Sequence, residues 1–166
     1  EGQMGGESLM TMVKVQSRVE EARAKLRLLP GESMLCACAS ADGAATQRLR
    51  AADVGGFVGR ALARHRVGRP PDNGGRAATF PSGNFYVCLT NRRMVVTNVV
   101  APAMNPTRIL AAYDKDDVIA LVWDEESGDG GHSDKVIVAF ADGTAVKFPV
   151  AHNNESECLP EKFLEW

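Results

Sequence analysis

The chain has 166 residues, of which 45% are hydrophobic and 24% are charged, and its formal net charge is −2. A chain of this length and composition can bury the core of one globular domain. No run approaches the ~20 consecutive apolar residues of a membrane-spanning helix, and the N-terminus lacks the basic-then-apolar pattern of a signal peptide. We therefore expect a cytoplasmic protein.

Charge is distributed unevenly along the chain. Residues 48–93 contain nine arginines and two aspartates, a net charge of +7, whereas residues 94–166 have a net charge of −8. Such polarity can orient a protein toward an anionic surface or toward another copy of itself. Scattered, solvated charges would give the same totals.

Residues 8–29 are expected to form an amphipathic helix that ends at Pro30 and Gly31. Its apolar residues follow three- and four-residue steps: Met12, Val15, Val19, Ala22, Leu26 and Leu29. This stripe could pair with a second chain or lie on the domain of its own chain. Because two and a half heptads are short for an independent coiled coil, packing within the chain is favoured. We place a helical extension at 1–30 and the main domain at 31–166.

Short apolar or alternating runs predict seven strands after this extension. Phe85 to Thr90 shows the period-two alternation of a half-buried strand. Asp142-Gly143 is a preferred dipeptide for a two-residue hairpin turn, and apolar runs flank it on both sides. The strands are expected at 33–39, 84–90, 94–100, 108–113, 118–123, 135–141 and 144–150.

The segment 41–80 separates the first two predicted strands. Residues 47–67 are predicted to form a helix, because apolar side chains recur at helical spacing: Val54, Phe57, Val58, Ala61 and Leu62. Residues 69–75, rich in proline and glycine, are expected to be a mobile linker. The basic helix could cover the open side of its own domain, lie on an anionic membrane or bind a partner.

A last helix is expected near the C-terminus, with Pro160 in its first turn. Phe163, Leu164 and Trp166 are predicted to plug one open end of a small barrel. Seven short antiparallel strands and a terminal helix indicate a barrel or roll, that is, a mainly β fold with helices (α+β).

The sequence offers few candidate chemical sites. Cys36 and Cys38 are two positions apart on one strand and should therefore face the same side of it. We interpret them as small core residues rather than zinc ligands. The acidic loop at 124–134 lacks the ligand order of a calcium loop. The chain has no nucleophile motif and no phosphate-binding glycine pattern. We expect no enzymatic activity, metal or cofactor, and arginines without interleaved aromatic residues argue against nucleic acid as a partner.

The run LTNRRMVV at 89–96 resembles a hairpin of bacterial pleckstrin-homology-like domains and their GRAM relatives. LPGE at 29–32 is similar to the lead-in to the first strand of those domains, and FADGTAVKF at 140–148 resembles their late hairpin. The similarity covers about 29–166, interrupted by 41–80. It implies a partly open seven-stranded barrel with a C-terminal capping helix, generally used to bind lipids or proteins rather than for catalysis.

These observations predict a non-catalytic interaction or adaptor module that binds a protein partner. We expect its binding surface to combine the arginine-rich insertion with the turn at 91–93, and the candidate residues are Arg60, Arg64, Arg66, Arg69, Asn91 and Arg92. Two alternatives are a peripheral membrane module that contacts anionic lipid head groups through these arginines, and a self-assembly domain that uses the N-terminal stripe.

Overall fold

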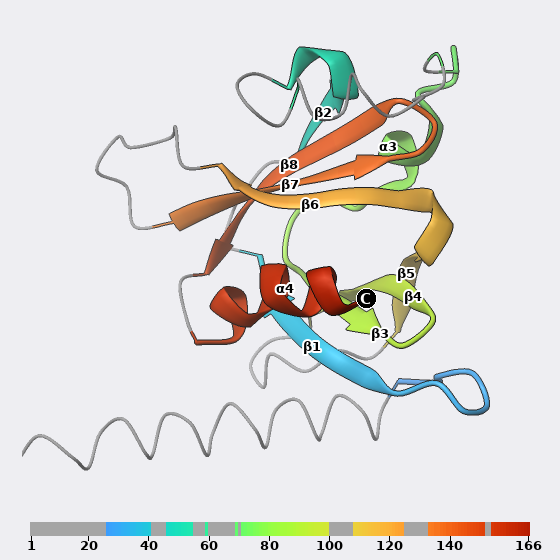
Figure 1. Cartoon of the computed structure of the whole chain (residues 1–166), viewed down its shortest axis with the longest axis vertical. Coiled ribbons are helices and arrows are strands. Elements are labelled where there is room, and N and C mark those ends of the chain that lie inside the picture. The colour runs from blue at the N-terminus through green and yellow to red at the C-terminus, as the bar shows by residue number, and fades with distance from the viewer. Residues whose placement is uncertain are drawn as a thin grey trace, which may run out of the picture.

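The computed structural model describes residues 26–40, 46–54, 59, 69, 71–99, 108–124, 133–151 and 154–166. These residues form a mainly β structure with two four-stranded antiparallel sheets, which lie one above the other in Figure 1. The coarse fold class predicted from the sequence, mainly β with a few helices, is therefore confirmed.

Sheet A has the strand order β1-β3-β4-β5. Its strands are β1 (Met34–Ala39), β3 (Phe85–Thr90), β4 (Arg93–Asn98) and β5 (Ile109–Asp114). Neighbours in this sheet are connected in sequence except for the long segment between β1 and β3, so β3, β4 and β5 form a simple meander.

Sheet B has the strand order β2-β8-β7-β6. Its strands are β2 (Gln47–Arg50), β6 (Val118–Asp124), β7 (Ser133–Phe140) and β8 (Thr144–Ala151). The predicted Asp142-Gly143 turn joins β7 to β8, and Gly143 adopts a φ of +82° there, which a side chain would disfavour.

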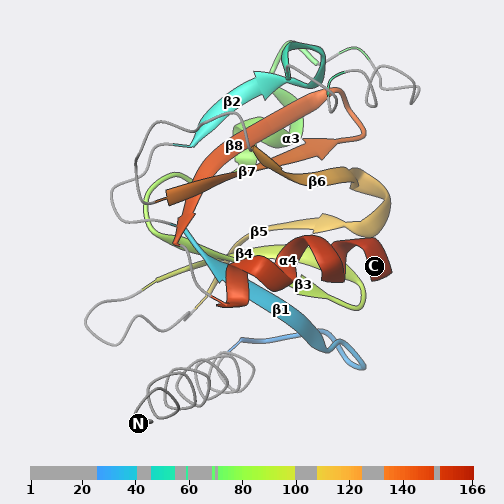
Figure 2. The ribbon, with the colours of Figure 1, turned by 60° about the vertical axis from the view of Figure 1, so that its left-hand side comes forward.

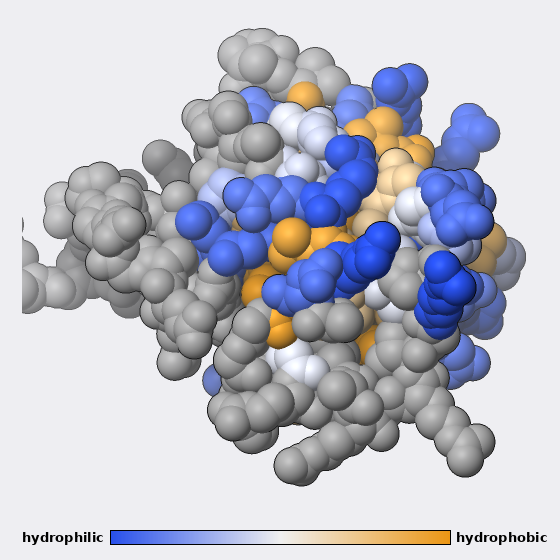
Figure 3. Space-filling model, turned by 90° about the horizontal axis from the view of Figure 1, so that it is seen from above, coloured by the Kyte–Doolittle hydropathy of each residue, from blue (hydrophilic) through white to orange (hydrophobic). Residues whose placement is uncertain are grey.

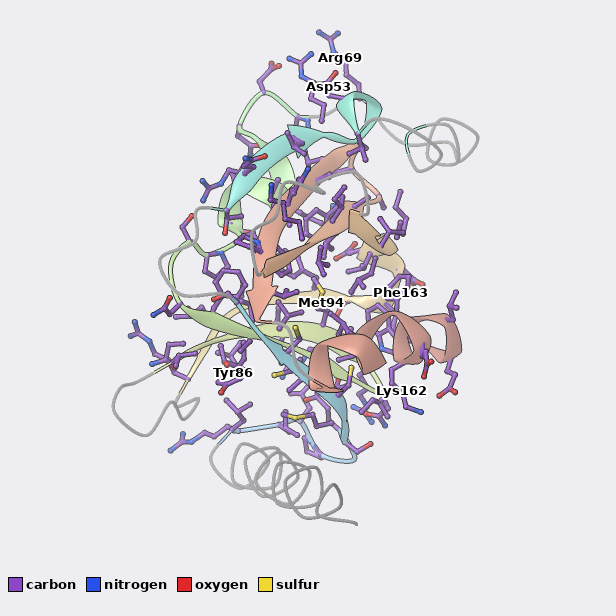
Figure 4. The ribbon with its side chains drawn as sticks, turned by 90° about the vertical axis from the view of Figure 1, so that its left-hand side faces the viewer. Asp53, Arg69, Tyr86, Met94, Lys162 and Phe163 are labelled. Carbon is purple, nitrogen blue, oxygen red and sulfur yellow. The ribbon has the colours of Figure 1, made fainter. Side chains whose placement is uncertain are left out.

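The main core fills the space between the two sheets. Alternate residues of each strand point into it, as Figure 4 shows for Met94, which lies between the sheets, and for Tyr86, which lies on the opposite side of sheet A. Its aromatic residues pack on one another, with ring centroids 4.8–6.0 Å apart: Phe80, Phe85, Tyr113, Phe140 and Phe148. These rings supply much of the apolar area that holds the sheets together.

Short helical elements close the ends of this sandwich. A 3-10 turn (Ala51–Asp53) follows β2, another (Lys115–Asp117) joins β5 to β6, and α3 (Gly75–Thr79) precedes β3. The C-terminal helix α4 (Asn154–Glu165) packs mainly against β1, beside sheet A and below sheet B (Figure 2). Within the described residues, a single backbone bridge from Ser40 to Val150 joins the two sheets, and they do not close into a barrel.

All seven strands expected from the sequence are present, with ends shifted by at most two residues. The predicted helix over 47–67 is wrong at its start, because residues 47–50 form β2 at the edge of sheet B. There Leu49 packs on the outer side of that sheet, and backbone pairing with β8 replaces helical hydrogen bonds. Residues 55–58 and 60–68 lie outside the described part of the chain.

The proline- and glycine-rich stretch is also more ordered than predicted. Residues 71–74 form a turn closed by the Gly74 N–H and the Pro71 carbonyl (3.0 Å), and α3 begins at Gly75. A helix of only five residues, such as α3, is too short to show a helical period in the sequence.

Two predictions for the C-terminal helix need correction. The helix begins at Asn154, so Pro160 lies in the helix interior and not in the first turn. In the interior the proline removes one backbone hydrogen-bond donor. Leu159, which is fully buried, anchors this earlier turn in the core. Phe163 and Trp166 pack against the core between the two sheets rather than in the end of a closed barrel, and Leu164 is 87% exposed because it lies on the opposite face of the helix.

The predicted N-terminal helix does not extend to residue 29. The Leu28 N–H bonds the Leu26 carbonyl (2.9 Å), and the Leu29 N–H bonds the Glu32 carboxylate (2.7 Å), so neither donor makes a helical bond. Residues 8–25, which contain most of the predicted stripe, lie outside the described residues.

Candidate functional site

The two motifs at the start of sheet A bind each other directly. Oε1 of Glu32, from LPGE, accepts hydrogen bonds from the Thr90 hydroxyl (2.7 Å) and from Arg93 Nε (2.9 Å). Oε2 accepts from Arg93 Nη2 (3.1 Å) and from the Leu29 N–H (2.7 Å). One carboxylate therefore joins the lead-in to the first strand with both ends of the Thr90–Arg93 turn.

The Asn91 side chain completes this junction. Its Oδ1 accepts from the Ser33 N–H (2.9 Å), its Nδ2 donates to the Gly31 carbonyl (3.1 Å), and its backbone N–H donates to the Ser33 carbonyl (3.0 Å). Asn91 thus positions residues 31–33, a role that sequence reasoning did not assign to it. Arg92, in contrast, is exposed on the same turn.

The pKa of Glu32 lies far below the ordinary range of a glutamate side chain. Burial alone would raise its pKa, but the hydrogen bonds from Arg93, the Leu29 N–H and Thr90 outweigh this and lower the pKa from 4.5 to about 2. The carboxylate side chain has no solvent exposure, and Arg93 is only 16% exposed. The Glu32–Arg93 ion pair therefore holds the two motifs together. The spacing of the motifs in the sequence does not indicate that they meet.

A second polar network holds α3 on sheet B. Asp142 Oδ2 accepts from the Arg76 N–H at the start of α3 (2.7 Å), and its Oδ1 accepts from the Thr144 hydroxyl (2.6 Å). The Arg76 guanidinium also pairs with Asp117 and approaches Asp142 (3.6 Å). Burial would raise the pKa of Asp142, but these hydrogen bonds and the Arg76 charge lower it. A carboxylate at the start of α3 complements the partial positive charge of that helix end.

The other end of α3 is held by an arginine. Arg48 of β2 donates from Nε to the Ala77 carbonyl (3.1 Å) and from Nη2 to the Phe80 carbonyl (3.0 Å). Both carbonyls lie at the C-terminal end of the helix, where regular helical donors run out, and the Ala77 carbonyl also accepts the Phe80 N–H (3.3 Å). Ala77 and Phe80 can then be buried in the main core. The predicted insertion therefore contributes a strand and a core segment to the domain.

The C-terminus docks at the same junction as the two motifs. Trp166 Nε1 donates to the Thr90 carbonyl (2.5 Å), and Lys115 Nζ donates to the Trp166 carbonyl oxygen (2.6 Å) while lying 5.4 Å from its ring centroid. The β3–β4 turn, the β5–β6 connection and the end of α4 are thereby fixed relative to one another.

The structure does not bring the described candidate residues into one site. Arg69 is exposed and lies near Asp53 at the end of the molecule beyond β2 (Figure 4). Asn91 and Arg92 belong to the turn of sheet A that contacts the C-terminus. Arg60, Arg64 and Arg66 lie outside the described residues. Of the remaining arginines in the basic region, Arg48, Arg76 and Arg93 are engaged in the internal contacts above.

Cys36 and Cys38 have the position that the strand pattern predicts. Cys36 and Cys38 are buried in the main core on one side of β1, and Cys88 is buried on the other side of sheet A. In the described part of the chain, no group of three or more histidine, cysteine, aspartate or glutamate residues is arranged to hold a metal ion. No described helix is both long and apolar enough to cross a membrane.

Both sheets carry apolar side chains on their outer faces as well. On sheet B, Ala51, Val54, Ile137, Ala139 and Ala145 are buried in an outer cluster. Four further side chains of this cluster are only half-buried: Leu49, Ile119, Ala120 and Val122. Figure 3 shows hydrophobic side chains on this face between bands of hydrophilic ones.

Polar side chains border the outer cluster of sheet B on one side. Lys147 lies opposite Ile137 in the β7–β8 register, and Lys135 is two residues from Ile137 on the same face. The face therefore combines an apolar centre with a cationic margin. We call it the outer face of sheet B.

No family model matches the chain, and no curated protein matches it.

Proposed function

We propose that the chain is a non-catalytic interaction module of pleckstrin-homology-like fold that binds a protein partner. The strand order supports the fold assignment: β1, β3, β4 and β5 form one sheet, β2, β8, β7 and β6 form the other, and the C-terminal helix packs mainly against β1, with smaller contacts to β6 and β3. The direct contact between LPGE and the Thr90–Arg93 turn also supports it, because the two resembling motifs then belong to one structural unit.

The outer face of sheet B carries the proposal of a protein partner. An antiparallel sheet with one face in water normally alternates apolar and polar residues. Here the side away from the core presents Ile119, Ala120 and Val122, all half-buried on β6. Contiguous apolar surface rimmed by polar groups is characteristic of protein interfaces. Ala51 and Val54, which follow β2 in the insertion, belong to this same cluster. The insertion and this face therefore form one proposed binding region.

Membrane binding is the second candidate, and the described charges favour it less. Arg50 and Arg69 are exposed within the insertion, but so are Asp53 and Asp72. A surface with both signs of charge gains little from an anionic bilayer. Flotation with neutral and anionic vesicles tests this candidate: the proposal predicts no flotation in either. Flotation with anionic vesicles alone, abolished by Arg60→Glu with Arg64→Glu, would replace the protein partner with a membrane.

Affinity capture with quantitative mass spectrometry tests the protein partner. The purified chain is compared with Val122→Glu, on the outer face of sheet B, and with Ala112→Glu, at an exposed position on β5 of sheet A. The proposal predicts a protein enriched by the wild type and by Ala112→Glu and lost with Val122→Glu. Enrichment that is equal in all three samples would refute the proposed face.

A further inference from the structure

The outer face of sheet A carries an apolar cluster that the core between the sheets does not use. Its buried strand residues are Met34, Ala37, Tyr86, Cys88 and Val95. Ala39, Val99 and Ile109 pack against them and are half-buried. An apolar outer face of this kind is stable only when something shields it from water.

Leu26 indicates which part of the chain lies on this face. It is 5% exposed and belongs to the cluster with Met34 and Val95. In the sequence it continues the apolar stripe of Met12, Val15, Val19 and Ala22. We propose that residues 8–25 dock on the outer face of sheet A of their own chain, with this stripe against the cluster.

The length of the segment fits the face. As a helix, 18 residues would span about 27 Å. The outermost of four strands spaced about 4.8 Å apart are about 14 Å from each other, so such a helix is long enough to cross the sheet. The Leu26 anchor holds the segment close to β1, and a short tether gives an effective concentration of the order of millimolar. A stripe on a second copy would have to compete with that local concentration.

Thr97 provides independent evidence that this face is shielded. It lies opposite Tyr86 in the β3–β4 register, on the outer side of sheet A, and has no solvent exposure. Among the described residues its hydroxyl is the buried side-chain polar group without a hydrogen-bond partner. A hydroxyl on an open sheet face would be solvated, so this part of the face is dry.

Thiol alkylation of the full chain tests the proposal, because the cysteines report on both sides of sheet A. Val19→Asp places a charge in the stripe, and Ser17→Asp places the same charge on the opposite side of the predicted helix. We expect Val19→Asp to speed alkylation of Cys88 by about tenfold or more, since access limits the reaction of a buried thiol. Cys36 and Cys38, in the main core, should be unaffected, and Ser17→Asp should change none of the three.

Light scattering on the same samples distinguishes the chain's own segment from that of a second copy. The proposal predicts a monomer for the wild type and for both variants. A wild-type dimer that Val19→Asp converts to a monomer would overturn it in favour of pairing between chains, and so would an unchanged Cys88 rate. If Val19→Asp unfolds the chain so that Cys36, Cys38 and Cys88 react together, Val15→Ser repeats the comparison with a milder change, and an unchanged Cys88 rate there overturns the proposal.

Discussion

Replacing Glu32 by glutamine tests the ion pair and hydrogen bonds that hold the two motifs together at the start of sheet A. The change removes the carboxylate charge while preserving the shape of the side chain, and it leaves Arg93, which is only 16% exposed, without its ion-pair partner. The main-chain donor of Leu29 and the hydroxyl of Thr90 also lose a charged acceptor. We therefore expect a clear loss of stability rather than the small effect of an ordinary surface substitution.

The pKa of Glu32 sets the scale of this loss. A decrease from 4.5 to about 2 corresponds to about 3 kcal/mol, at about 1.4 kcal/mol per pKa unit. Arg93 keeps 16% of its side chain exposed, and solvent screening there weakens the interaction, so we expect Glu32→Gln to lower the free energy of unfolding by about 2 kcal/mol at pH 7. Glu161→Gln, at an exposed position of α4, should change it by less than about 0.5 kcal/mol.

The sign of the pH dependence follows from the direction of the shift. Because the folded pKa of Glu32 is lower than the unfolded one, its contribution is complete above pH 4.5 and is lost as the pH falls toward 2. Denaturant unfolding at several pH values should therefore show the wild type and Glu32→Gln converging as the solution is acidified. A constant difference between them down to pH 2.5, or no difference at pH 7, would refute the reasoning.

Three further substitutions test the packing of the main core, the start of α3 and the outer face of sheet A. Phe80→Ala should lower the unfolding free energy by about 3–5 kcal/mol in denaturant titrations, because the ring is fully buried among other aromatic rings, whereas Leu164→Ala should have almost no effect. Gly75→Ala should destabilise more than Gly83→Ala: both have positive φ, but a Cβ on Gly75 would clash with the carboxylate of the β7–β8 turn, and one on Gly83 would meet nothing within 4 Å. Greater stability of Gly75→Ala than of Gly83→Ala would contradict the close approach. Thr97→Val should raise the thermal midpoint, because it removes a buried hydroxyl that has no partner, and a lower midpoint would contradict that assignment.

The sequence predicted the elements whose pattern is local. Short apolar runs, of which only Phe85–Thr90 alternates, located the strands of sheet A, although β3 is buried on both faces rather than half-buried, and Asp142-Gly143 located the hairpin of β7 and β8. The same reasoning failed for β2, since QRLR contains one large apolar residue and its partner strand lies almost a hundred residues later. Pairing over such a distance leaves no period in the sequence.

The polar networks could not be foreseen for the same reason. Glu32 and Arg93 are separated by 61 positions, and Arg76 and Asp142 by 66, so spacing gave no indication that they meet. The sequence predicts Asn91 as part of a binding surface at the turn 91–93, whereas in the fold its side chain holds residues 31–33. The sequence groups the arginines of residues 48–93 into one basic region, but the described ones that are engaged make separate contacts in different parts of the fold.

Site-specific photo-cross-linking in cells tests the central claim, a protein partner on the outer face of sheet B, most directly. A photoreactive phenylalanine analogue is placed at position 122 on this face, at position 112 on β5 and at position 92 in the turn of sheet A. A partner on the outer face of sheet B should give a discrete protein adduct from position 122 and none from position 112. An adduct from position 92 with none from position 122 would contradict it and would place the partner on the turn.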